Sequence, residues 1–353
     1  MSVKQVYFRK NLSDRASKDL DGSYVNLDFY SRIIEEDCDG YWKDEHGKRH
    51  FLFSFRKKVI PDRLTRLTLD SFRKFSMTKK ENRGAAAGPI SPSKLPKYVA
   101  KVDSTRKMKN RAYFYKQDGV KSKQAISNLS PSNIAGFFDY PPSHPSLKTN
   151  SDRCKETNFV MKHPQKWGHV QPYIQHVDSL YRQIRPHLYS RQRKKADQVI
   201  EFTIPKTVFS TLTMNYSWRA AIHQDKHNIK RKDGVAILTV AEDHLNKNHY
   251  RGCFLGFPQF GFAVNVRQGD ILITDNHSGW HGNTQFYPRR ERQPVQLQKP
   301  EFPKTDRNQW SAKDIKNNWY FNRMSMVYYL REGLSNCTSV KKEKHSDKKS
   351  IKK

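Results

Sequence analysis

Two histidines and one aspartate have the residue types and the spacing of a metal site. His223 and Asp225 stand two residues apart, and His281 follows within the segment Trp280–Asn283. Residues two apart on an extended strand point to the same face, so both side chains can reach one ion. Two imidazoles and one carboxylate are typical of a non-haem Fe(II) centre that keeps coordination positions open. A His-x-Asp pair alone is weak evidence, because the same two residues also form structural hydrogen-bonded pairs.

The surrounding sequence predicts the short β-strands that would position these residues. The run at 235–240 is apolar, which is typical of a strand buried on both faces. Several short strands separated by turn signals favour a sandwich or a jelly roll, whose open mouth lets distant residues converge on a ligand. The predicted strands are 208–214, 235–240, 254–257, 261–266, 271–274 and 324–330.

These motifs resemble the oxygenase domain of the J-binding proteins, one branch of a family of nucleic-acid-modifying dioxygenases. The resemblance is carried by 210–225, 256–258, 266–270 and 277–284, and it extends from about residue 83 to residue 332. The ten-eleven-translocation methylcytosine dioxygenases form the other branch, and His223–Asn228 is similar to their His-x-Asp-x-His-Asn motif.

The resemblance implies both a fold and an activity. Family members use Fe(II), O2 and 2-oxoglutarate to hydroxylate the 5-methyl group of a pyrimidine in DNA. The expected fold is mainly β with flanking helices (α+β), built on a double-stranded β-helix, which is a jelly roll. A hydroxylase of RNA or protein on the same fold and a non-catalytic nucleic-acid binder are the alternatives.

The resemblance also assigns the metal ligands. His223, Asp225 and His281 are expected to hold Fe(II) and to be the catalytic residues. His277 competes for the third position, but His281 precedes Gly-Asn-Thr and matches the distal histidine of the family.

Arg323 is expected to bind the C5 carboxylate of 2-oxoglutarate. It precedes the last predicted strand, as the corresponding arginine of the family does. A guanidinium fork pairs bidentately with a carboxylate, which explains the choice of arginine. Arg267 and Arg219 are its rivals, and a surface ion pair is the alternative role for any of the three.

Asn228 and Arg331 are the expected contacts to the substrate base. Asn228 matches an asparagine that contacts cytosine in the ten-eleven-translocation enzymes, but an amide can donate or accept and discriminates poorly. Arg331 stands where those enzymes place a base-contacting histidine, eight residues after Arg323 (331 − 323). Arginine only donates, which suits the O4 acceptor of thymine better than the amine of cytosine. Thymine is therefore slightly favoured, unless Arg331 turns outward to pair with Glu332 or another acid.

The composition points to a polyanionic partner. The chain has 353 residues, and 66 Lys and Arg against 34 Asp and Glu give a formal net charge of +32. So basic a protein is expected to bind nucleic acid, here DNA, although a solvated basic surface is the simpler alternative. No signal peptide or long apolar span is recognisable, so an intracellular protein is expected, in the nucleus or at the site of viral DNA, with no membrane partner. The four scattered cysteines predict free thiols in a reducing compartment.

The chain divides into three predicted parts. Residues 1–80 form an N-terminal extension with its strongest strand at 51–55, and 81–335 form the dioxygenase domain. That domain has a barrel core at 205–332 and an inserted, proline-containing loop at 285–318, in which Ser311–Asp314 reads as a capping box. Residues 336–353 form a disordered basic tail.

Two further segments attract attention. The clearest helix is predicted at 172–195, with Pro172 in its first turn and Pro186 ending or kinking it. Its basic residues stand near Tyr181 and Tyr189, which suits phosphates with base stacking; a core-packed helix with a solvated basic face is the alternative. The small residues of 82–89 let the backbone approach another group closely.

Overall fold

Two facing β-sheets enclose the interior of the molecule. The computed structural model describes residues 3–81, 83–103, 105, 110–122, 124–140, 153–242, 250–288 and 323–337. Within these residues the larger sheet has nine strands in the order β1-β3-β4-β14-β10-β17-β9-β7-β8, and the smaller has four in the order β15-β12-β13-β2. Strands β11 and β16 form one separate pair, and β5 and β6 form another.

The strands are short, as the sequence predicts. Those of the larger sheet are β1 Lys4–Phe8, β3 Cys38–Lys43, β4 Arg49–Arg56, β7 Ser132–Asp139, β8 Cys154–Glu156, β9 Thr211–Tyr216, β10 Ala236–Glu242, β14 Ile271–Thr274 and β17 Arg323–Tyr329. Those of the smaller sheet are β2 Arg32–Ile34, β12 Leu255–Phe257, β13 Phe262–Val264 and β15 Gly282–Asn283. The two separate pairs are formed by β5 Val99–Val102, β6 Phe114–Lys116, β11 Tyr250–Gly252 and β16 Phe286–Pro288.

Each predicted strand of the barrel is confirmed, with ends that shift by up to three residues. The central strand β10 is buried along its whole length and pairs antiparallel with β14 on one side and β17 on the other. Such a strand has both faces covered, which explains why its sequence does not alternate.

The two faces of the larger sheet meet two different cores. Along β17, Met324, Met326 and Tyr328 join the core that also contains the helices, because alternate side chains point to opposite faces. Val327 and Tyr329 join the core between the two sheets, together with Phe257 and Phe262 of the smaller sheet. The fold is therefore an α+β jelly roll with helices on the outer face of its larger sheet.

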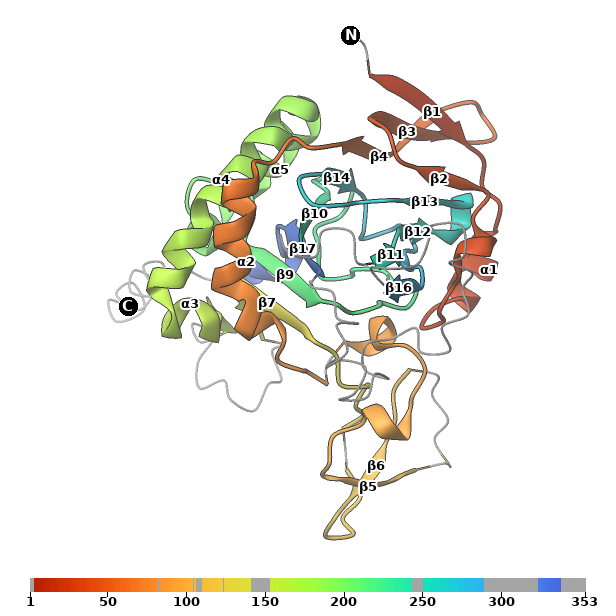
Figure 1. The fold of residues 1–353 in the computed structure, drawn as a ribbon, viewed down its shortest axis with the longest axis vertical. Coiled ribbons are helices and arrows are strands. Elements are labelled where there is room, and N and C mark those ends of the chain that lie inside the picture. The colour runs from red at the N-terminus through yellow and green to blue at the C-terminus, as the bar shows by residue number, and fades with distance from the viewer. Residues whose placement is uncertain are drawn as a thin grey trace, which may run out of the picture.

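Helices α2, α4 and α5 cover that outer face (Figure 1). The helices are α1 Asp14–Asp19, α2 Asp62–Ser76, α3 Asn158–Lys162, α4 Pro164–Ile184 and α5 Pro186–Gln198. The predicted break at Pro186 is confirmed, but the predicted start at Pro172 is wrong. Pro164 occupies the first turn of α4, and Pro172 lies inside the helix.

The proposed stacking role of this helix is also wrong for Tyr181. The Tyr181 side chain is fully buried, and its hydroxyl donates to Oε1 of Gln192 at 3.1 Å. The hydroxyl of Tyr189 donates to Asp178 at 2.8 Å. Both rings support the packing of α4 on α5, whereas phosphate contacts by the exposed basic residues of the two helices stay a prediction.

The N-terminal residues are part of the two sheets. The strand expected at 51–55 lies within β4, which pairs with β14 and so links β3 and β1 to the barrel. Strand β2 pairs with β13 of the smaller sheet. The domain boundaries stay a prediction. Most of the inserted loop 285–318, including Ser311–Asp314, and nearly all of the tail 336–353 lie outside the described residues.

The prediction of four free thiols is wrong for two of the cysteines. Cys154 on β8 and Cys337 form a disulfide between residues 183 apart in sequence, with Cα atoms 6.1 Å apart. The spacing of the cysteines could not indicate this pair, because the two residues come together only when the fold places β8 against the segment that follows β17. Cys38 and Cys253 are free and buried.

No helix within the described residues is long and apolar enough to span a membrane.

Candidate metal centre and its cavity

A backbone bridge brings the two candidate histidine ligands together. The amide of His223 donates to the carbonyl of His281 at 2.9 Å, and the amide of His281 donates back at 3.0 Å. Gly282 permits this approach, since a Cβ atom there would lie 2.9 Å from the backbone of Ala221 and Ile222. The two rings consequently lie 4.4 Å apart between their centroids.

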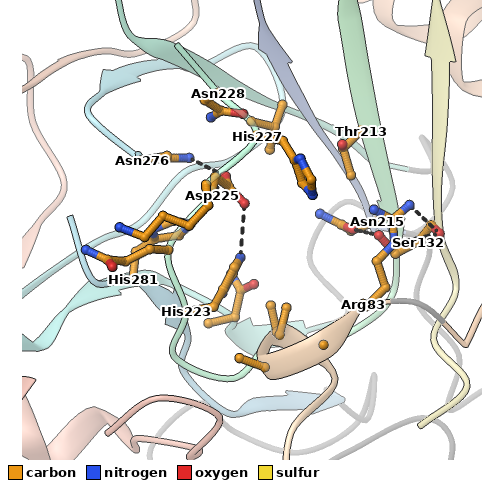
Figure 2. Close-up of a pocket in the computed structure, with 18 of the residues that line it drawn as sticks. Arg83, Ser132, Thr213, Asn215, His223, Asp225, His227, Asn228, Asn276 and His281 are labelled. Atoms are coloured by element: carbon orange, nitrogen blue, oxygen red, sulfur yellow. Dashed lines mark hydrogen bonds and ion pairs between the residues drawn. The ribbon is translucent and has the colours of Figure 1, made fainter. Parts of the chain in front are cut away.

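Asp225 completes a cluster with the donor set of an Fe(II) site. Its Oδ1 lies 3.4 Å from Nε2 of His223, and its Oδ2 lies 3.6 Å from Nε2 of His281. The ligand atoms of all three residues lie within 4.8 Å of one another. Figure 2 shows the three side chains converging.

The backbone also selects the ring nitrogens that can bind a metal. Nδ1 of His223 lies 2.8 Å from the carbonyl of Ala221, and Nδ1 of His281 lies 2.9 Å from the carbonyl of Gly279. A carbonyl oxygen only accepts, so Nδ1 carries the proton in each ring and the lone pair remains on Nε2. Both Nε2 atoms face Asp225, as ligation by all three residues requires.

The carboxylate of Asp225 is charged in this setting. Burial opposes its ionisation, but without a metal the protonated imidazoles of His223 and His281 would donate to it through Nε2 and hold the pKa of Asp225 well below its usual range. A bound metal ion would take the place of those protons on Nε2. Asn276 adds a contact from Nδ2 to Oδ2 of Asp225 at 3.4 Å, and its carbonyl accepts from the Asp225 amide at 2.8 Å. The negative charge and its fixed position suit a divalent cation.

The three residues line a cavity of about 390 Å³. Its other walls come from η2 (Gly84–Ala87), from the inner face of β17 and from the loop that follows Asp225. Residues 83–86 of the segment in which the sequence predicted a close backbone approach thus form part of the wall. The Ala221 amide donates to the carbonyl of Ala86 at 2.9 Å and ties this wall to the metal loop.

His277 and Asn228 lie next to the metal cluster. Nδ1 of His277 lies 2.7 Å from the carbonyl of Asn228, and His277 is absent from the three-residue cluster found among the described residues. Asn228 lines the cavity and is 3% exposed, and its Nδ2 has no hydrogen-bond partner among the described residues. A buried amide donor without a partner is costly, so Asn228 is suited to an incoming acceptor.

The three candidate carboxylate-binding arginines differ in what they already bind. Arg219 donates to the carbonyls of Asn283 and Val25. Arg267 donates to the carbonyl of Tyr250 and lies 3.7 Å from Glu242. Arg323, on β17, is 3% exposed, and its Nε has no hydrogen-bond partner within the described part of the chain. Nη1 of Arg267 likewise has no hydrogen-bond partner among the described residues, and Arg323 is not among the residues that line the cavity, so its role in binding a carboxylate stays a prediction.

Arg331 lines the cavity and forms an ion pair, as the alternative reading allowed, but with an acid that the sequence did not identify. Its Nε donates to Oδ1 of Asp139, the last residue of β7, and both side chains are 12% exposed. The other expected partner, Glu332, lies 3.5 Å from Nζ of Lys230 instead. Arg331 therefore faces the cavity wall and not the solvent.

Sequence reasoning missed Arg83 as a cavity residue. Its Nε and Nη2 donate to the carbonyl of Ser132 at 3.1 and 2.8 Å. Ser132 in turn donates to Oδ1 of Asn215 at 2.5 Å, and all three line the cavity (Figure 2). Burial lowers the pKa of Arg83. The only signal was its place at the start of the small-residue segment 82–89.

Comparisons with known proteins agree with this site. Residues 133–302 match the family Tet_JBP, described as the oxygenase domain of the 2OGFeDO superfamily. The chain is 31% identical over 210 residues to thymine dioxygenase JBP1 of Leishmania major, covering 60% of this chain and 24% of that protein. It is 28% identical over 225 residues to thymine dioxygenase JBP1 of Trypanosoma brucei brucei, covering 64% and 22%. The chain thus spans about a quarter of the length of these relatives.

A solved structure described as NgTET1 in complex with 5mC DNA aligns with 96% of this chain and 100% of its own, at 10% identity and a TM-score of 0.44. Residues 133–302, which match the family model, include the whole metal cluster and most of the barrel. The chain thus carries a 2-oxoglutarate- and Fe(II)-dependent oxygenase domain that matches the Tet_JBP family model over residues 133–302, just under half of its length.

Proposed function

We propose that the chain hydroxylates the 5-methyl group of a pyrimidine in DNA. The observation that carries the proposal is one cavity that holds the His223–Asp225–His281 cluster together with Asn228 and Arg331. A metal cluster alone is compatible with many oxygenase substrates. The side chains of Asn228 and Arg331 can hydrogen-bond the edge of a base, which favours a nucleic-acid substrate over the other substrate classes of such oxygenases.

His223, Asp225 and His281 would hold Fe(II), and Arg323 would pair with the C5 carboxylate of 2-oxoglutarate. When bound, Fe(II) with 2-oxoglutarate and O2 supplies the oxidising chemistry that converts a C–H bond to C–OH. The protein fixes the three ligands through the backbone contacts of their imidazoles and through Asn276.

The base must leave the duplex stack to enter such a cavity. Flipping a nucleotide out of a duplex costs a few kcal/mol, which contacts to the extruded base must offset. Asn228 supplies an amide with a free donor, and Arg331 supplies donors only. A donor-only contact favours the O4 acceptor of thymine over the amine of cytosine, so thymine is the preferred base and 5-methylcytosine the second choice.

The test is 2-oxoglutarate turnover that depends on DNA. Purified protein with Fe(II) and 2-oxoglutarate should release succinate when DNA is added. His223→Ala and Asp225→Ala should abolish this release and leave DNA binding largely intact, because both residues are metal ligands. His46→Ala is the matched control, since its side chain is 84% exposed. Succinate release by the ligand variants at the wild-type rate would refute the metal assignment.

A further inference from the structure

A separate β-hairpin adjoins the cavity and carries an excess of positive charge. The arm is defined here as the described residues 91–103, 105, 110–122 and 124–126, and it contains β5 and β6. The pair β5–β6 joins neither large sheet, and it lies apart from them at the bottom of Figure 1. The described residues of the arm include six cations, namely Lys94, Lys97, Lys101, Arg111, Lys116 and Lys121, against two carboxylates, Asp103 and Asp118.

The two carboxylates of the arm serve its own structure. Lys121 lies 2.7 Å from Oδ2 of Asp103, and Thr105 donates to Oδ1 of Asp103 through its hydroxyl at 2.6 Å. Lys121 and Thr105 lower the pKa of Asp103 to about 2. Asp118 accepts the amide of Val120 at 3.0 Å within the turn at the tip. Neither acid neutralises the other cations.

Three lysines remain exposed and available to a ligand. Lys97, Lys101 and Lys116 are exposed and form no ion pair within the described part of the chain. Lys101 lies on β5 and Lys116 on β6, and Lys97 stands two residues before β5. Isolated lysines on a protein surface normally remain solvated. These three lysines differ from isolated surface lysines because the arm that carries them is attached at the cavity wall.

The base of the arm is anchored to the cavity wall. Nδ2 of Asn128 donates to the carbonyls of Ala87 and Pro89 at 2.9 and 2.7 Å, and its Oδ1 accepts the amide of Ser91 at 2.9 Å. Ala87 is the last residue of η2, whose neighbouring residues line the cavity. The arm therefore leaves the molecule at the cavity wall.

Arg111 connects the arm to the cavity itself. It is exposed, it lines the cavity, and a Cβ on Gly84 would lie 3.3 Å from its Nη2. Lys97, Lys101 and Lys116 do not line the cavity, so only a ligand that fills the cavity and extends along the arm could contact both Arg111 and these lysines. A polyanionic chain has this property, and a free nucleobase does not.

We infer that the arm binds the phosphate backbone of DNA that flanks the base held in the cavity. The inference rests on the proposed function for the identity of the partner. Lysine contacts to phosphates give affinity without sequence readout, and they release counterions. The arm would therefore contribute affinity for any duplex and leave the choice of base to the cavity.

The test measures duplex binding by the full-length protein without Fe(II) or 2-oxoglutarate, from low to physiological ionic strength. The variant is Lys97→Glu/Lys101→Glu/Lys116→Glu. The control, Lys74→Glu/Lys162→Glu/Lys166→Glu, makes the same change in net charge at exposed positions of α2, α3 and α4. Each lost phosphate contact should lower the slope of log K against log salt by about 1, so the arm variant should lose about 3 units. The control should keep most of the wild-type slope.

Equal affinities and slopes for the two variants would overturn the inference. Tighter binding to duplex RNA than to DNA of the same sequence would overturn the choice of partner. Because binding is measured without turnover, the two proposals fail separately. If the arm variant changes the salt dependence of DNA binding but the wild type hydroxylates no base, only the proposed function is refuted. If the wild type hydroxylates DNA but the arm variant keeps the wild-type salt dependence of binding, only the role of the arm is refuted.

Discussion

Asp139 determines where the guanidinium of Arg331 can lie. It accepts from Nε of Arg331 across a sequence separation of 192 residues, and a Cβ on Gly333 would lie 2.1 Å from its Oδ2. Arg331 is thus confined between β7 and the turn after β17. The guanidinium also hydrogen-bonds the side chain of Tyr329, which lines the same cavity. Asp139 is therefore a positioning residue for the proposed reader of thymine.

Substitution of Asp139 should change substrate preference more than metal binding. Asp139→Ala removes the ion pair, while Asp139→Asn keeps an acceptor oxygen and loses the charge. A well-placed contact to a base edge contributes about 1–3 kcal/mol of discrimination. The ratio of kcat/KM for thymine to that for 5-methylcytosine should consequently fall about tenfold in Asp139→Ala and less in Asp139→Asn.

Fe(II) affinity provides the control for this prediction. It should stay at the wild-type value in both Asp139 variants, because Asp139 contacts no metal ligand. Unchanged base preference in Asp139→Ala would remove the positioning role, and a parallel loss of Fe(II) affinity would indicate general structural damage.

The metal ligands could be predicted from the sequence in two steps. The spacing of His223 and Asp225 is a local signal, whereas the choice of His281, 56 residues after Asp225 (281 − 225), depended on the resemblance to the family motif. Asp139 and Arg83 could not be found in this way. Their partners, Arg331 and Ser132, come from strands that are distant in sequence, and no spacing rule connects them.

At the scale of elements, a disulfide fastens the end of the barrel. Cys154 lies opposite Asp139 in the β7–β8 pair, and Cys337 follows η10 (Glu332–Asn336). The cross-link therefore holds together the two segments that carry Asp139 and Arg331. Closing so long a loop restricts the unfolded chain, which stabilises the folded state.

Loss of this disulfide should lower the free energy of unfolding by about 2–4 kcal/mol. Urea unfolding of the oxidised wild type and of Cys337→Ser measures the difference. Reductant should bring the wild type close to the variant and leave the variant unchanged. Equal stability of Cys337→Ser and the oxidised wild type would show that the two cysteines are not cross-linked in solution.

The strands were easier to predict from the sequence than the helices. Strands of the barrel have apolar runs bounded by turn residues, and β10 shows why a run without alternation is a central strand. The start of α4 was misplaced because Pro164 and Pro172 suit a first turn equally well by residue type alone. Burial of Trp167 and Val170, which precede Pro172, extends the helix toward its N-terminus.

In the whole molecule, the helices pack on one face of the larger sheet and the cavity lies on its other face. The outer face of the larger sheet is closed by α2, α4 and α5, while its inner face and the smaller sheet share the second core. The cavity is lined from the inner face of β17, from the metal loop and from η2. Net charge predicted a polyanionic partner, but not that the arm would place Arg111 at the cavity, since that depends on tertiary structure.

Nucleoside mass spectrometry of treated DNA tests the central claim most directly. DNA that contains both thymine and 5-methylcytosine is incubated with the full-length protein, Fe(II), 2-oxoglutarate and O2, then digested to nucleosides. We expect 5-hydroxymethyluracil from the wild type and none from Asp225→Ala. Hydroxymethylcytosine without hydroxymethyluracil would overturn the preference for thymine, and the absence of both products would contradict the assignment of a DNA methylpyrimidine hydroxylase.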